Sequence, residues 1–106
     1  MKIAVIRQAC CSADDQINAL DAMYEVDASI TVDALLQKIC ASNFLQYSST
    51  HSRLSVEVAG RQLAEVGPSG ILSWSANVSG AELAMTSIGK NTLHFFFRPN
   101  AIAARG

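Results

Sequence analysis

The chain has 106 residues, half of them apolar and 16% charged, and this length predicts a single domain with a modest core. The net charge of −1 gives no reason to expect nucleic acid or an acidic membrane surface as a partner. No apolar run approaches the ~20 residues that cross a bilayer, and the apolar stretch at the start is far too short for a signal peptide. We therefore expect a cytoplasmic protein.

The three cysteines are odd in number and two of them are neighbours, which does not describe a disulfide framework. Cys10, Cys11 and Cys40 are therefore expected to be reduced and to behave as small apolar side chains. The alternative is that one of them is a nucleophile or a redox sensor. The two histidines, His51 and His94, lack metal-ligand spacing to the cysteines, so no metal or other cofactor is predicted.

The first part of the chain predicts two strands. Residues 2–7 are rich in β-branched side chains and predict a strand that has Ile3 and Val5 on one face. Residues 9–20 are small and polar and predict a long turn. The alternation of residues 22–28 predicts the second strand.

A helix is predicted to follow, because the apolar period then changes. Thr31 is the expected N-cap, with Asp33 in the first turn where the helix dipole favours a carboxylate. The helix is expected to end near residue 44, with Lys38 on its polar side. Its apolar stripe consists of Val32, Leu35, Leu36 and Ile39.

The next part of the chain predicts a hairpin after a polar loop at residues 46–52. Residues 53–58 alternate as a strand, residues 59–62 form a turn, and Leu63 begins a short return. Residues 67–70 contain Gly-Pro-Ser-Gly and interrupt the chain. The alternation of residues 53–58 places one set of side chains on one face (Leu54, Val56, Val58) and the other set on the opposite face (Arg53, Ser55, Glu57).

The last part of the chain predicts a further strand at residues 71–78, one helical turn within residues 81–88 and a final strong strand at residues 91–98. The first of these strands has an alternating apolar face: Leu72, Trp74, Ala76 and Val78. Residues 99–106 have no periodicity and begin with Pro99, which ends a sheet. They predict a flexible C-terminal tail.

This order of elements predicts an α+β fold in two layers, because one amphipathic helix must cover one face of a mixed sheet. We expect four to six strands, a domain at residues 1–98 and a tail at residues 99–106. No paired carboxylates, Ser-His-Asp set, Gly-rich phosphate loop or metal spacing is present, so the protein is not expected to be an enzyme.

Several segments, in the same order, resemble ubiquitin over about two-thirds of the chain. Residues 1–5 are similar to its first strand, and residues 26–39 align without a gap to its second-strand exit and helix. Residues 59–63 are similar to the turn after its third strand, and residues 92–98 to its final strand. The spacing of Leu83 and Ile88 matches its short helical turn. The resemblance implies a β-grasp fold, with insertions at residues 9–20 and 66–80.

The resemblance also implies chemistry at the C-terminal tail. In ubiquitin-like modifiers an activating enzyme adenylates the terminal glycine, a conjugating enzyme carries it as a thioester, and the glycine is then joined to target proteins. The resemblance gives this conjugating role to Gly106, with a processing protease among the expected partners. These enzymes are expected to recognise the tail through Arg98, Ala104 and Arg105. The family usually ends in two glycines, whereas this chain ends in one. The alternative is that residues 99–106 are an ordinary frayed terminus with no reactive role.

The ubiquitin receptor patch, carried over residue by residue, predicts a partner surface at Glu57, His94 and Phe96. Glu57 replaces the central isoleucine, and an unpaired carboxylate is costly at an interface, so we expect a dedicated partner rather than ordinary ubiquitin receptors. Phe96 is either an anchor for that partner or is covered by the inserted segment with Trp74. That segment is either a specificity strand for the dedicated enzymes, with Trp74 as a contact, or an edge strand that extends the core.

Two lysines, Lys38 and Lys90, lie where ubiquitin has lysines and are candidate chain acceptors; the alternative is that both are ordinary solvated charges. Divergence and insertions make a prokaryotic ubiquitin-like conjugation operon the most similar system. The resemblance to such operons implies a role in bacterial antiviral defence. The competing function is a non-covalent β-grasp binding module, such as an adaptor or a toxin-neutralising immunity protein.

Overall fold

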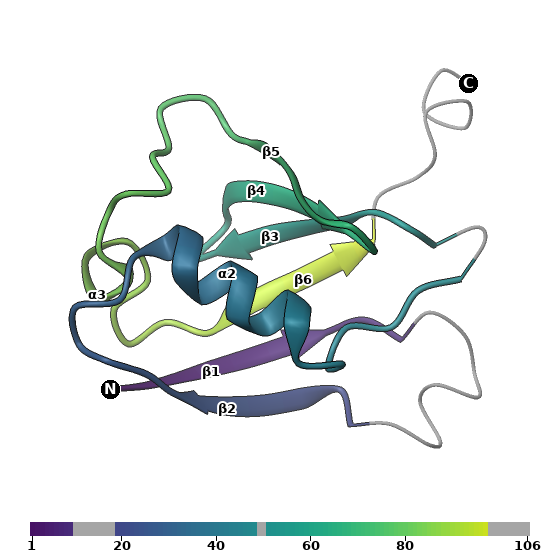
Figure 1. The fold of residues 1–106 in the computed structure, drawn as a ribbon, viewed down its shortest axis with the longest axis horizontal. Helices are drawn as coiled ribbons and strands as arrows, with labels where there is room; N and C mark the ends of the chain where they lie inside the picture. The colour runs from purple at the N-terminus through teal and green to yellow at the C-terminus, as the bar shows by residue number, and fades with distance from the viewer. Residues whose placement is uncertain (10–18, 49–50, 98–106) are drawn as a thin grey trace.

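The computed structural model describes residues 1–9, 19–48 and 51–97, and these form a six-stranded mixed sheet with two helices (Figure 1). The strands follow the order β2-β1-β6-β3-β4-β5 across the sheet. The predicted α+β class is confirmed. The strands are β1 (Lys2–Arg7), β2 (Asp21–Glu25), β3 (Leu54–Val58), β4 (Arg61–Gly67), β5 (Gly70–Trp74) and β6 (Leu93–Phe97); the helices are α2 (Val32–Ala41) and α3 (Ala84–Ser87).

The first and last strands lie side by side in the middle of the sheet. β1 and β6 are parallel, whereas every other neighbouring pair is antiparallel. β6 therefore has partners on both sides, β1 and β3. The edges of the sheet are β2 and β5.

The predicted first strand is confirmed, and Ile3 and Val5 are both buried. Arg7 lies on the same face and is also buried, and its guanidinium carbon lies 5.3 Å from the centre of the Phe44 ring. The second strand ends at Glu25, earlier than the predicted residue 28. It ends there because the chain turns, with the Ile30 N–H donating to the Asp27 carbonyl at 3.1 Å.

Helix α2 begins as predicted, since the Ala34 N–H donates to the Thr31 hydroxyl oxygen at 3.2 Å. It ends at Ala41, three residues before the predicted end. The Ser42 N–H and hydroxyl both donate to the Ile39 carbonyl, and Asn43 then takes a left-handed φ of 63°. These contacts cap the helix and prevent a further turn.

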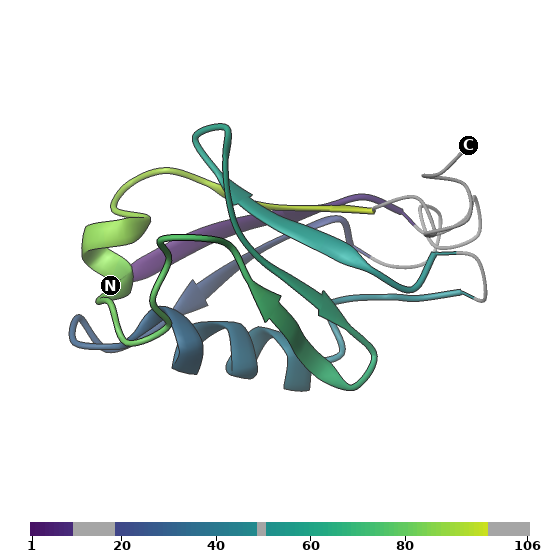
Figure 2. The same ribbon diagram turned by 90° about the horizontal axis from the view of Figure 1, so that it is seen from above.

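Helix α2 covers one face of the sheet, as the edge-on view shows (Figure 2), and the core side chains lie between the two. All four residues of the predicted helix stripe are buried, as are the three core-facing residues of β3. The largest buried side chain is Phe95 of β6. We call the face that contacts α2 the inner face and the opposite face the outer face.

The β3–β4 hairpin has a two-residue turn rather than the predicted four-residue turn. Ala59 and Gly60 have φ values of 53° and 81°, the sign that tight hairpin turns require. Arg61 and Gln62 therefore already belong to β4. The predicted short return is a strand of seven residues.

The predicted strand at residues 71–78 is wrong beyond Trp74. Val78 N–H donates to the Ser75 carbonyl at 3.2 Å and Asn77 has a φ of 65°, so the chain turns there. A register shift in the β4–β5 pair also breaks the alternation at Leu72. As a result Trp74 packs against the core with Ile71, whereas Leu72 is exposed. Ala76 also lies outside the strand.

The last predicted elements are present but shorter. α3 is a single turn within predicted residues 81–88, and β6 lies within residues 91–98. The predicted tail at residues 99–106 and most of the insertion at residues 9–20 lie outside the described residues.

Candidate protein interface

Three of the predicted partner-surface residues lie together on the outer face of β3 and β6. Glu57 is directly opposite His94 in the antiparallel pair, and Ser55 is opposite Phe96. The His94 and Phe96 rings are stacked, with centres 5.4 Å apart and planes 4° apart. Phe96 is 37% exposed, so an aromatic surface and a carboxylate face solvent side by side.

A chain of hydrogen bonds holds the Glu57 carboxylate. The Ser75 hydroxyl donates to Gln62 Oε1 at 3.1 Å, and Gln62 Nε2 donates to Ser55 Oγ at 3.0 Å. Ser55 Oγ in turn donates to Glu57 Oε2 at 2.9 Å. Ser55 is fully buried although it faces outward, since its neighbours on this face cover it. These linked hydrogen bonds orient the Glu57 carboxylate, which still accepts hydrogen bonds from further donors at the surface.

Apolar side chains continue the outer face next to this group. Ile6 is paired with His94 across β1 and β6 and is 42% exposed. Met23 is 62% exposed on the neighbouring edge strand. The sequence analysis missed both residues. An apolar side chain at the outward position of a strand, as Ile6 is in the alternation of β1, was the available signal.

We call Ile6, Met23, Glu57, His94 and Phe96 the outer patch. An apolar patch with a polar centre is the composition typical of a protein-interaction surface.

The two candidate acceptor lysines are both exposed. Lys38 lies on the solvent side of α2, as predicted. Lys90 lines an open hollow of about 520 Å³ on the outer side of β1, together with Met1, Lys2, Ala4, Met23 and Met85. Exposure leaves each amine accessible to a reaction partner.

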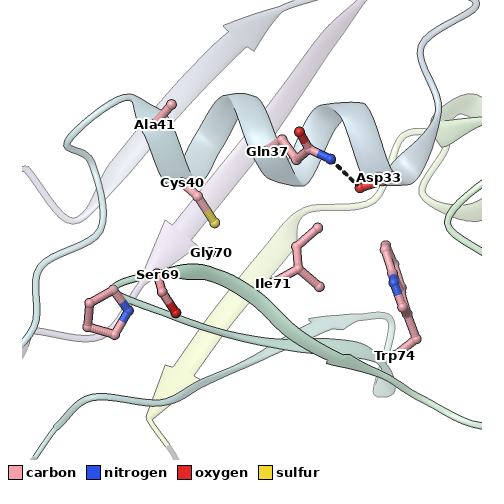
Figure 3. A pocket seen from close by; sticks show the side chains of 9 residues that line it. Asp33, Gln37, Cys40, Ala41, Ser69, Gly70, Ile71 and Trp74 are labelled. Atoms are coloured by element: carbon pink, nitrogen blue, oxygen red, sulfur yellow. Dashed lines mark hydrogen bonds between the residues drawn. The ribbon is translucent and has the colours of Figure 1, made fainter.

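Trp74 does not belong to the outer patch. Its side chain points from β5 toward α2, on the inner side of the sheet (Figure 3). The segment that carries Trp74 therefore does not cover Phe96. Trp74 thus lies apart from Glu57, His94 and Phe96, because the break in alternation at Leu72 places Ile71 and Trp74 together on the inner face. Its expected role as a contact for dedicated enzymes remains a prediction.

Trp74 instead lines an open groove of about 540 Å³ between α2 and β5, which we call the α2–β5 groove (Figure 3). Burial raises the pKa of the Cys40 thiol in its wall, so this thiol is protonated at neutral pH. The side chains that form the groove include Asp33, Gln37, Cys40, Ser69, Ile71 and Trp74.

The predicted tail residues Arg98, Ala104, Arg105 and Gly106 lie outside the described residues, as do Cys10 and Cys11. Within the described ranges, no three His, Cys, Asp or Glu side chains come together as metal ligands would. Neither α2 nor α3 has the length and apolar content that a membrane-crossing helix needs.

Comparison with protein-family models, with curated proteins and with solved structures found no match to this chain. The function is therefore inferred from the fold, the outer patch and the α2–β5 groove.

Proposed function

We propose that the domain is a divergent ubiquitin-like β-grasp. The support is the position of the last strand: β6 lies parallel to β1 at the sheet centre, with an antiparallel strand on each side of the pair. One main helix, α2, covers one face of this arrangement. In this proposal β5 is an extra strand at the edge of the ubiquitin-like sheet.

We further propose that the protein is a ubiquitin-like modifier, conjugated through the carboxylate of Gly106. The observation that carries this proposal is the central position of β6, since it agrees with the order of segments that resemble ubiquitin. Gly106 becomes the reactive end either directly or after cleavage by a processing protease.

The proposed chemistry is that of the family. The Gly106 carboxylate attacks the α-phosphate of ATP on an activating enzyme and releases pyrophosphate. A cysteine thiolate then displaces AMP to form a thioester, which passes to a conjugating enzyme. Finally a lysine amine of a target protein displaces the thiolate and forms an isopeptide bond. Glycine suits this role because it has no Cβ to hinder close approach.

In this proposal the outer patch recognises a dedicated partner. Phe96 and Ile6 supply apolar contact area, while Glu57 selects a partner that offers a donor or a cation. Ordinary ubiquitin receptors present an apolar surface to this position and leave the carboxylate unpaired, which disfavours their binding.

The test is conjugation in vitro. The chain is incubated with ATP and the proteins encoded beside its gene, and higher-mass species are detected by denaturing electrophoresis. We expect a thiol-sensitive species with the conjugating enzyme and a thiol-resistant species with targets. Deletion of Gly106 removes both, whereas the control substitution Asn100→Ala in the same segment retains them. Species that persist without Gly106 would show that the proposal is wrong.

A non-covalent binding module is the second candidate, and the exposed apolar side chains of the outer patch favour it. In that case a partner binds equally well to the chain with and without Gly106. Substitution of Phe96 by Ser then abolishes binding in both forms, so the two candidates give different results.

A further inference from the structure

The strand β5 has an open edge. Among the described residues β5 pairs on one side only, with β4, and the Ser75 N–H that follows it donates to the Leu63 carbonyl at 2.9 Å. Backbone groups of successive residues in an antiparallel strand point to opposite sides. The N–H and C=O of Trp74 therefore point away from β4, toward the open edge, where another strand can pair with them.

Helix α2 lies alongside this edge and encloses the α2–β5 groove with it. Ile71 and Trp74 point from β5 toward the helix, and the Cys40 sulfur points back toward the β4–β5 hairpin (Figure 3). The volume of about 540 Å³ accommodates several side chains of an added segment. The groove thus combines an unpaired strand edge with a space beside it.

At one end of the groove Trp74 and Asp33 lie against the same residue, Gly80. A Cβ atom added to Gly80 would lie 2.7 Å from Cζ2 of Trp74 and 3.0 Å from Cβ of Asp33. The Asp33 N–H also donates to the Gly80 carbonyl at 2.9 Å. The missing side chain of Gly80 therefore allows Trp74 and Asp33 to come together.

The charge of the groove is negative. Asp33 is its only acidic lining residue, and no lysine or arginine lines it within the part of the chain that the structure describes. Asp33 Oδ1 accepts a hydrogen bond from Gln37 Nε2 at 2.8 Å. Among the described residues Asp33 has no ion pair. A tryptophan beside such a carboxylate matches a cationic side chain, through cation–π attraction and a charged hydrogen bond.

We propose that the α2–β5 groove binds an extended segment of a partner protein, which adds to the open edge of β5 and places an arginine or lysine side chain against Trp74 and the Asp33 carboxylate. Main-chain hydrogen bonds to the edge supply affinity, and the cation supplies specificity. This inference is independent of conjugation at Gly106 and concerns a surface separate from the outer patch.

A displayed library of random seven-residue peptides tests the proposal. Peptides enriched on the full chain are synthesised and titrated, with fluorescence as the readout, because Trp74 is the only tryptophan. We expect the enriched peptides to share an arginine or lysine and to change Trp74 emission. Asp33→Asn is expected to weaken binding about tenfold or more, since it removes a charged hydrogen bond. The matched control Asp21→Asn, on the opposite edge strand, leaves affinity unchanged.

Strand addition is tested on the same peptides. N-methylation of the alternate amides that face β5 is expected to abolish binding, whereas methylation of the other set has little effect. Hydrogen exchange of the Trp74 amide is expected to slow on binding.

Four results overturn the proposal. The first is the absence of enriched peptides, and the second is enrichment without a basic residue. The third is equal binding by Asp33→Asn. The fourth is a change in Trp74 emission with protein concentration alone, or on truncation after Phe97, which would identify another copy or this chain's own segment as the occupant.

Discussion

Two tyrosines of this domain differ in how their hydroxyl groups are satisfied. The Tyr24 hydroxyl lies 2.6 Å from Ser42 Oγ and shares a hydrogen bond with it. The Tyr47 hydroxyl is buried and has no hydrogen-bond partner among the described residues. Burial raises the pKa of Tyr47 above its ordinary value of 10.0, and the neighbouring Cys40 raises this pKa further. Tyr47 is therefore a side chain whose polar atom costs stability.

We expect Tyr47→Phe to leave the free energy of unfolding unchanged or to raise it by about 1 kcal/mol at pH 7, because it removes a buried polar atom without a partner. Above about pH 10 the unfolded chain releases the phenolic proton while the folded chain retains it, so the wild type loses stability as pH rises. The variant lacks this loss. Urea unfolding at neutral pH and at about pH 10.5 measures both effects.

Tyr24→Phe is the matched control for this prediction, because it breaks the hydrogen bond to Ser42. It is expected to lower the free energy of unfolding by about 1 kcal/mol at neutral pH. A loss of equal size in Tyr47→Phe would mean that the Tyr47 hydroxyl has a stabilising partner.

At the scale of elements, α2 and β5 show why one prediction succeeded and another did not. The cap at Thr31 and the stripe of α2 depend on residues three and four positions apart, and local sequence specifies these. The orientation of β5 depends on its register with β4, where a shift at Leu72 places Ile71 with Trp74 on the inner face and leaves Leu72, predicted to share the face of Trp74, exposed. Nothing in the alternation of residues 71–78 indicates that shift.

Thr31→Ala is expected to lower the free energy of unfolding by about 1 kcal/mol, because it removes the acceptor for the Ala34 N–H at the start of α2. Thermal unfolding followed by circular dichroism measures the change. Thr31→Ser retains the hydroxyl and is expected to remain close to the wild type. An equal loss in both variants would attribute the effect to the lost methyl group and not to the cap.

At the scale of the whole molecule, the sheet is completed only by the last strand. β6 has hydrogen-bonded neighbours on both sides and contributes Leu93 and Phe95 to the core. Within the described sheet, the N-terminal strands are hydrogen-bonded to the β3–β5 strands only through β6. We therefore expect the domain to unfold as one cooperative unit.

A chain that ends at Asn91 is expected to have no cooperative unfolding transition, because the removal of β6 leaves β1 and β3 each without a neighbour on one side and opens the core. Circular dichroism and the dispersion of amide resonances measure this loss. The control chain that ends at Arg98 keeps all of β6 and is expected to unfold cooperatively. A folded chain without β6 would contradict the central role of this strand.

From the sequence alone we predicted the α+β class, the position of α2 and its buried stripe, and the core faces of β1 and β3. These features follow from periodicity and capping, which act between residues close in the chain. The grouping of Glu57, His94 and Phe96 was predicted by resemblance and agrees with the β3–β6 register.

Only the tertiary structure decided the central place of β6, the inward turn of Trp74 and the groove that it forms with Asp33. Each of these depends on strand register and on packing between residues far apart in the chain. Local periodicity does not encode such contacts, because one extra residue in a strand reverses which side chains face the core.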